Sequence, residues 1–120
     1  DPPNGLRLVF TGRQPEHCTL LEQTAPVEAG APYRMSYKWR GDTLPKADGL
    51  RWAVTEPGTG RELAAGALVG GDGVWQDGVL GFSAPVAGGA VRLALEYHRA
   101  PGTTRIEGSL WVREVSMDLR

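Results

Sequence analysis

The chain has 120 residues, a length typical of a single globular domain. Its 13 Lys and Arg residues are balanced by 14 Asp and Glu residues, so it carries no net positive charge for holding nucleic acid or an anionic membrane. It also lacks an apolar run near the roughly 20 residues of a membrane span. We therefore expect no nucleic-acid partner and no direct membrane insertion.

The chain begins at Asp1, with neither an initiator methionine nor an apolar signal-peptide segment. We find no internal repeat, low-complexity tract or linker. We therefore interpret residues 1–120 as one domain excised from a longer protein.

Alternation of apolar and polar residues is the main pattern, and it predicts β-strands because successive strand side chains point to opposite faces. In chain order, the predicted strands cover residues 6–10, 18–23, 33–40, 50–55, 62–68, 74–82, 91–98 and 106–119. The 17 Gly and 9 Pro residues punctuate these segments with turns. About eight short strands with such turns are typical of an all-β sandwich or barrel.

In the last predicted strand, the alternation of apolar and polar residues shifts by one position. Its aliphatic residues have even numbers from Ile106 to Val112, whereas those from 115 to 119 have odd numbers. One extra residue near Arg113, a β-bulge, would keep both sets on one face. Alternatively, Trp111 begins the inward-facing set and no bulge is needed.

Most aromatic residues share the parity of aliphatic neighbours, which predicts that they pack in the core. This set comprises Tyr33, Tyr37, Trp39, Trp52 and Tyr97. If the bulge is present, Trp111 becomes the best candidate for an exposed aromatic ring.

The opposite faces of the strongest strands are polar and rich in arginine. Strand pairing could gather Arg34, Arg51 and Arg92 into a basic patch, with His98 on the same polar face of its strand. Such a patch would suit an acidic glycan or an acidic protein surface, whereas the alternative is an ordinary solvated sheet. The candidate ligand-binding residues are Arg34, Arg51, Arg92, His98 and Trp111.

No sequence motif for catalysis or phosphate binding is present, so we expect no enzymatic activity. The single cysteine, Cys18, excludes an internal disulfide. Together with His17 and His98 it is a poor supply of ligands for a tetrahedral zinc site. We expect no cofactor and no metal.

Several segments follow a recurrent pattern: a first strand ending in Phe10-Thr11-Gly12, a V-x-x-G-x-x-Y segment over 27–33, and a closing strand over 108–117. The pattern resembles the galactose-binding-like jelly rolls that include bacterial carbohydrate-binding modules. It resembles still more closely the accessory jelly-roll domains of bacterial tetratricopeptide-repeat and envelope proteins. The resemblance implies an antiparallel β-sandwich of jelly-roll type with about eight strands.

The resemblance also implies a function, namely a non-catalytic accessory module of a larger bacterial protein with carbohydrate as its ligand. Such a protein would be secreted, periplasmic or associated with the cell envelope. The alternative is a structural or protein-interaction domain that docks on neighbouring domains of its parent protein. Calcium-bearing members carry Asp in the closing strand where this chain has Arg113 and Glu114, so a structural calcium is not expected.

Overall fold

The computed structural model describes residues 6–11, 17–42, 49–68, 73–98 and 107–119, within which the regular elements are all β-strands. The strands are β1 (Leu6–Thr11), β2 (His17–Val27), β3 (Pro32–Asp42), β4 (Leu50–Thr55), β5 (Glu62–Ala67), β6 (Gln76–Ser83), β7 (Gly89–His98) and β8 (Glu107–Leu119). The prediction of about eight strands is therefore confirmed. The strand predicted over 74–82 begins only at Gln76, and residues 73–75 form a turn in which Gly73 has a φ of 75°.

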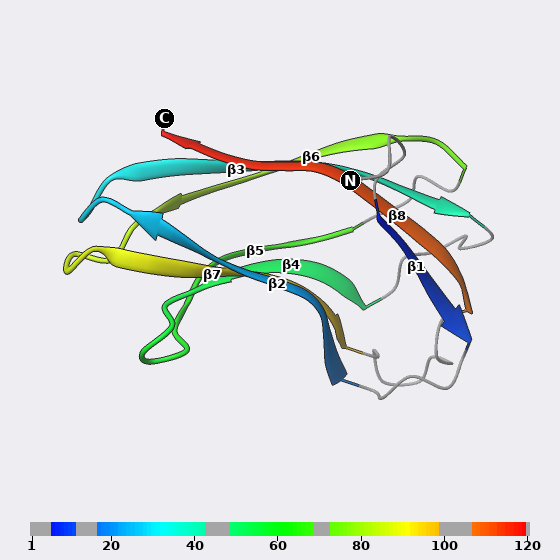
Figure 1. Ribbon diagram of the computed structural model, residues 1–120, viewed down its shortest axis with the longest axis horizontal. Helices are drawn as coiled ribbons and strands as arrows, with labels where there is room; N and C mark the ends of the chain where they lie inside the picture. Colours follow the sequence, from blue (N-terminus) through cyan, green and yellow to red (C-terminus); the bar gives the residue numbers. More distant parts are fainter. Residues whose placement is uncertain (1–5, 12–16, 43–48, 69–72, 99–106, 120) are drawn as a thin grey trace.

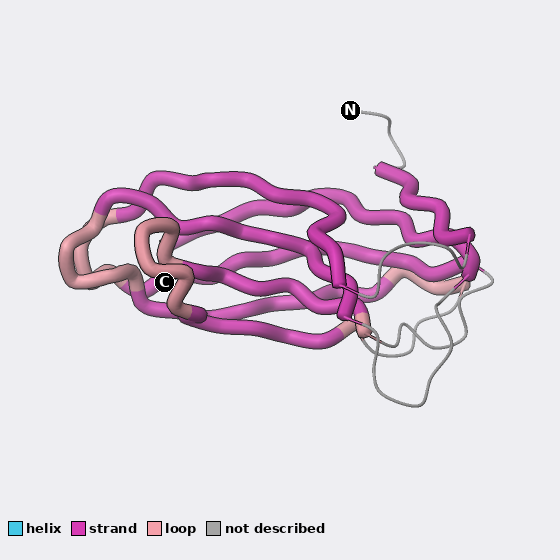
Figure 2. Tube along the Cα trace, turned by 90° about the horizontal axis from the view of Figure 1, so that it is seen from below, coloured by secondary structure: helices cyan, strands magenta, loops and turns pink. Residues whose placement is uncertain are grey.

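Two four-stranded sheets form a sandwich. The first sheet has the order β1-β8-β3-β6, the second has the order β2-β7-β4-β5, and every pairing is antiparallel. Figure 1 shows them as two layers, with β3, β6 and β8 in one and β2, β4 and β7 in the other. The turns after β2, β4 and β6 gather at one end of the sandwich (Figure 1), where Figure 2 draws long loops in pink. This confirms the predicted all-β antiparallel sandwich.

The core lies between the two sheets and is built from the residues that alternation placed inward. Met35 and Tyr97 are fully buried, and Trp39 and Trp52 are buried almost completely. Tyr37 of the first sheet packs against Trp52 of the second, with ring centroids 5.5 Å apart. The predicted assignment of the aromatic residues to the core is thus confirmed.

The parity change in β8 is a β-bulge. Ser36 of β3 pairs with Ser116, whereas Lys38 pairs with Arg113, so Tyr37 lies opposite two residues of β8. One of these two is Glu114, which has a φ of 54°. The extra residue restores the inward face, and this confirms the bulge in preference to an inward-facing Trp111.

Candidate functional site

Trp111 lies on the outer face of the first sheet because its neighbours Leu110 and Val112 are buried in the core. In the strand register it stands between Arg7 of β1 and Arg40 of β3. The guanidinium carbons of these arginines lie 5.8 Å and 5.5 Å from the Trp111 ring centroid. Both distances are within the range of cation–π attraction, so the indole is held between two positive charges.

A second indole continues this arrangement. Trp75, which directly precedes β6, has the guanidinium carbon of Arg40 at 5.2 Å and that of Arg113 at 3.8 Å from its ring centroid. Arg40 thus contacts both indoles. We call Arg7, Trp111, Arg40, Trp75 and Arg113 the tryptophan–arginine row.

Hydrogen bonds and ion pairs connect the row to its surroundings. Arg7 donates a hydrogen bond from Nη2 to Ser109 Oγ at 3.1 Å, and Arg113 Nε lies 3.4 Å from a Glu114 carboxylate oxygen. Lys38 Nζ lies 3.7 Å from carboxylate oxygens of both Glu114 and Asp77. Arg7 and Arg113 are thus each tied to a neighbouring side chain, and both indoles are half-buried.

The predicted patch of three arginines does not form. Arg34 is exposed on β3 of the first sheet, whereas Arg51 on β4 and Arg92 on β7 belong to the second sheet. Alternation shows which side chains of a strand point outward, but it does not show to which of the two sheets the strand belongs. Ligand binding by the individual residues remains a prediction.

On the second sheet, carboxylates neutralise the two arginines. Arg92 Nε lies 3.0 Å from Glu22 and its Nη1 lies 3.8 Å from Glu96, while Arg51 forms ion pairs with Glu96, at 3.4 Å, and with Glu62. The hydrogen bond from Arg92, followed by its charge, lowers the pKa of the Glu22 carboxyl. The hydrogen bond with Glu22 in turn raises the pKa of Arg92. Positive and negative groups alternate here, so the surface offers an anion little net attraction.

The last predicted site residue, His98, has a histidine partner. It pairs in register with His17 at the end of the β2–β7 ladder, and the two Nδ1 atoms are 2.9 Å apart. His98 Nε2 also lies 3.3 Å from Glu96 Oε1. Sequence reasoning named His98 but missed this pairing, because the strand register that creates it has no local signal.

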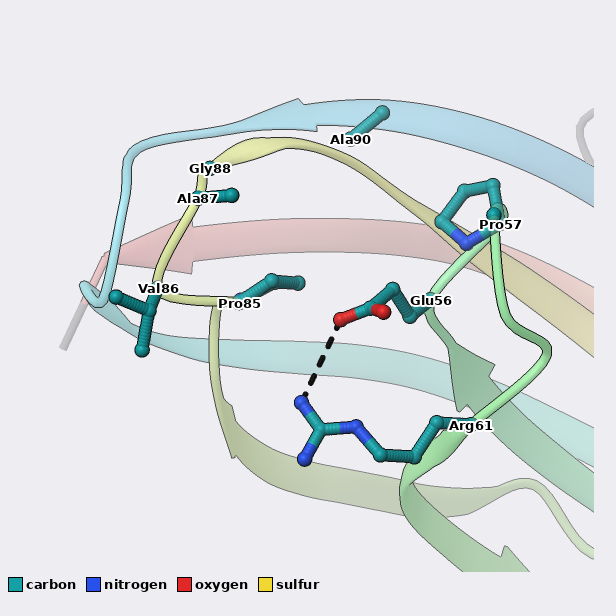
Figure 3. A pocket seen from close by; sticks show the side chains of 9 residues that line it. Glu56, Pro57, Arg61, Pro85, Val86, Ala87, Gly88 and Ala90 are labelled. Carbon is teal, nitrogen blue, oxygen red and sulfur yellow. Dashed lines mark hydrogen bonds and ion pairs between the residues drawn. The ribbon is translucent and has the colours of Figure 1, made fainter.

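A depression of about 510 Å³ lies at the turn end of the sandwich (Figure 3). Two turns line it, residues 56–61 after β4 and residues 85–90 around the β6–β7 connection. Arg61 forms an ion pair with Glu56 of the same turn at 3.4 Å. The residues that line the depression include no aromatic side chain, so it offers no surface on which a sugar ring can stack. The sequence analysis predicted only turns in these two segments.

Membrane-spanning helices and clusters of metal-ligating side chains are both absent from the described residues. None of the described segments forms a helix long and apolar enough to cross a membrane. In the same residues, no group of three or more His, Cys, Asp and Glu side chains is arranged to hold a metal ion.

The chain matches no protein-family model, and a search of curated proteins finds no match either. Solved structures do match it. A structure of CBM4 superposes with a TM-score of 0.65 at 15% identity and covers 82% of this chain. The C-terminal domain of EclA, a sugar-binding protein, has a TM-score of 0.64 at 14% sequence identity and covers 95% of this chain. A family 16 carbohydrate-binding module has a TM-score of 0.63 at 11% sequence identity and covers 93% of this chain. The domain shares the jelly-roll β-sandwich fold of these three structures.

This jelly roll spans 59% of the CBM4 chain, 78% of the EclA chain and 74% of the family 16 chain. Identities of 11–15% are evidence for the shared fold alone. The function of this jelly roll must therefore be argued from its own surface.

Proposed function

We propose that this jelly roll is a non-catalytic carbohydrate-binding module whose tryptophan–arginine row binds an acidic glycan. The observation that carries the proposal is the interleaving of two outward-facing indoles with three guanidinium groups on one sheet. A pyranose ring stacks on an indole face, and a guanidinium group binds a carboxylate or sulfate through two parallel hydrogen bonds. The row offers both kinds of contact within one short stretch.

The positions of the arginines favour an acidic ligand over a neutral one. The Arg113 guanidinium lies over the Trp75 ring at 3.8 Å, so it covers an indole face that a neutral sugar would need. A neutral pyranose would have to displace this arginine without offering it a partner. An acidic sugar can instead draw the guanidinium into a charge-assisted hydrogen bond while its ring takes the indole face that the guanidinium leaves.

A second candidate function is the docking of an acidic protein surface on the same row. Val9 of β1 and Val74 beside Trp75 are 60% and 59% exposed, so apolar groups border the row. Exposed apolar residues beside arginines also suit a protein partner. Such a partner could be a neighbouring domain of the parent protein.

The wider setting follows the resemblance of the sequence. We propose a module of a larger bacterial protein that is secreted, periplasmic or associated with the envelope, with tetratricopeptide repeats as neighbours. The likeness to solved carbohydrate-binding modules supports a non-catalytic module outside the cytoplasm or at the envelope, whereas the bacterial origin and the repeats rest on the sequence resemblance alone.

The test is a glycan array with the isolated domain, followed by calorimetric titration of the glycans that bind. We expect binding to uronate-containing or sulfated glycans that weakens as salt is added, because salt screens exposed charges. Silence across all acidic and neutral glycans, together with binding to an acidic protein partner, would favour docking. Binding to neutral glycans alone would contradict the proposal for the row.

Matched variants locate the site. Trp111→Ala and Arg40→Ala should each weaken binding by about tenfold or more, as for central residues of an interface. The controls are Arg34→Ala, at the other end of strand β3 from Arg40, and Arg92→Ala on the second sheet. Loss of binding in the controls but not in Trp111→Ala would move the site from the row to the arginines that the sequence analysis predicted.

A further inference from the structure

His17 and His98 converge on the outer face of the second sheet. They are directly opposite in the β2–β7 register, and both side chains are exposed. Their Nδ1 atoms are 2.9 Å apart and their ring planes are nearly perpendicular, at 89°. The chain contains only these two histidines.

The neighbouring carboxylate determines which nitrogens carry protons. Glu96 Oε1, at 3.3 Å, can accept a hydrogen bond from Nε2–H of His98. The Nδ1 of a neutral His98 then has a free lone pair, which accepts the proton of His17 Nδ1–H. If the His17 proton moves to its Nε2 atom, both Nδ1 lone pairs face the gap between the two rings.

This geometry is close to that of two ligands on one metal ion. Two nitrogens bound at about 2.0–2.1 Å lie about 2.9 Å apart when the angle at the metal is a right angle, and about 3.3 Å apart at a tetrahedral angle. The Nδ1 separation of 2.9 Å corresponds to the right angle. Square-planar coordination by nitrogen and oxygen is typical of Cu(II) and Ni(II), and Cu(II) binds such sites more tightly.

We propose that His17 and His98 form a two-histidine site for Cu(II), bound through the two Nδ1 atoms. Water would fill the remaining coordination positions, since no third ligating side chain joins the pair among the residues that the structure describes. Glu96 acts as the carboxylate behind a metal-binding histidine and keeps the Nδ1 atom of His98 unprotonated. This site lies on the opposite sheet from the tryptophan–arginine row and is independent of the proposed glycan binding.

The arginines of this sheet hold Glu96 in place. Arg51 Nε lies 3.4 Å from Glu96 Oε1, and Arg92 Nη1 lies 3.8 Å from Oε2. The carboxylate is therefore fixed from two sides and half-buried, so its contact with His98 does not depend on a freely moving side chain. One cysteine and two histidines are a poor supply of ligands for tetrahedral zinc, but composition does not show that strand register brings both imidazoles together.

The experiment is a titration of the full chain with Cu(II), followed by electron paramagnetic resonance and by nuclear magnetic resonance of the amides and imidazoles. We expect one ion per chain, a signal with two coupled nitrogens, and paramagnetic broadening centred on residues 17–19 and 96–98. The variants His17→Gln and His98→Gln should each remove this localised broadening. Glu96→Gln should weaken the affinity by about tenfold, as for other carboxylates behind metal-bound histidines.

Two control variants make the result specific. Thr19→Ala changes an exposed neighbour on the same strand, and Cys18→Ser removes the only thiol. Both should bind Cu(II) as the unaltered chain does. Unfolding temperatures measured without metal should match the unaltered chain in His17→Gln and His98→Gln, because both histidines are exposed. Broadening that persists in His17→Gln, that Cys18→Ser abolishes, or that centres on Asp1 would overturn the proposal, and so would the absence of saturable binding.

Discussion

Replacement of Trp39 by alanine tests whether the aromatic residues of β3 form the core or a binding surface. Trp39 is 4% exposed and packs among the inward residues of both sheets. A buried tryptophan removes about 200 Å² from water, which corresponds to about 5 kcal/mol. Alanine retains part of this burial, while the cavity adds a cost, so we expect Trp39→Ala to lower the free energy of unfolding by about 3–5 kcal/mol.

The assay is equilibrium unfolding in urea, with Trp111→Ala as the matched control. Trp111 is half-buried on the outer face, so its loss should cost about 1 kcal/mol or less, mainly from cation–π contacts. A loss below about 1 kcal/mol for Trp39→Ala would refute the core assignment. If Trp111→Ala lowered the free energy of unfolding more than Trp39→Ala did, the buried and exposed faces of the first sheet would be the opposite of those described.

Three further predictions concern packing, the bulge and pH. Gly78→Ala should destabilise the fold by about 1–3 kcal/mol in urea unfolding, because a Cβ there would lie closer than 3.0 Å to the Tyr37 ring; an unchanged midpoint would contradict this close packing. Glu114→Gly should stabilise by about 0.5–1 kcal/mol, because glycine adopts the positive φ of the bulge without strain, and a destabilised variant would argue against that conformation. The pKa of Glu22 is lower in the folded state, so its ion pair with Arg92 stabilises above the unfolded-state pKa and is lost as the pH falls through the folded-state pKa. Carboxyl titration by nuclear magnetic resonance should show this pKa rising toward its ordinary value in Arg92→Leu, and an unchanged pKa would exclude Arg92 as the cause.

Local patterns were sufficient to predict much of the fold. The alternation around Met35 and Leu95 correctly indicated which faces are buried, because burial repeats every second residue in a strand. The alternation depends on neighbours in the sequence, so the sequence alone can show it. The parity change near Arg113 raised the bulge as one of two alternatives, and only the pairing of β8 with β3 decided between the bulge and an inward-facing Trp111.

The arrangement of the surface could not be predicted in the same way. Arg34 and Arg92 have similar outward positions on strong strands, yet they lie on different sheets. The pairing of His17 with His98 depends on the register of two strands that are far apart in the chain. The stacking of Arg40 between two indoles has the same origin, since Trp75 approaches β3 only after β6 has paired with it.

The central claim, that an acidic glycan binds the tryptophan–arginine row, is tested most directly by following the indole N–H signals during titration with an oligouronate. The chain has four tryptophans, so each signal can be assigned. We expect the signals of Trp75 and Trp111 to shift in a saturable manner, while those of the buried Trp39 and Trp52 stay in place. Saturable shifts confined to residues of the second sheet or of the turn depression, with Trp75 and Trp111 unmoved, would contradict the account.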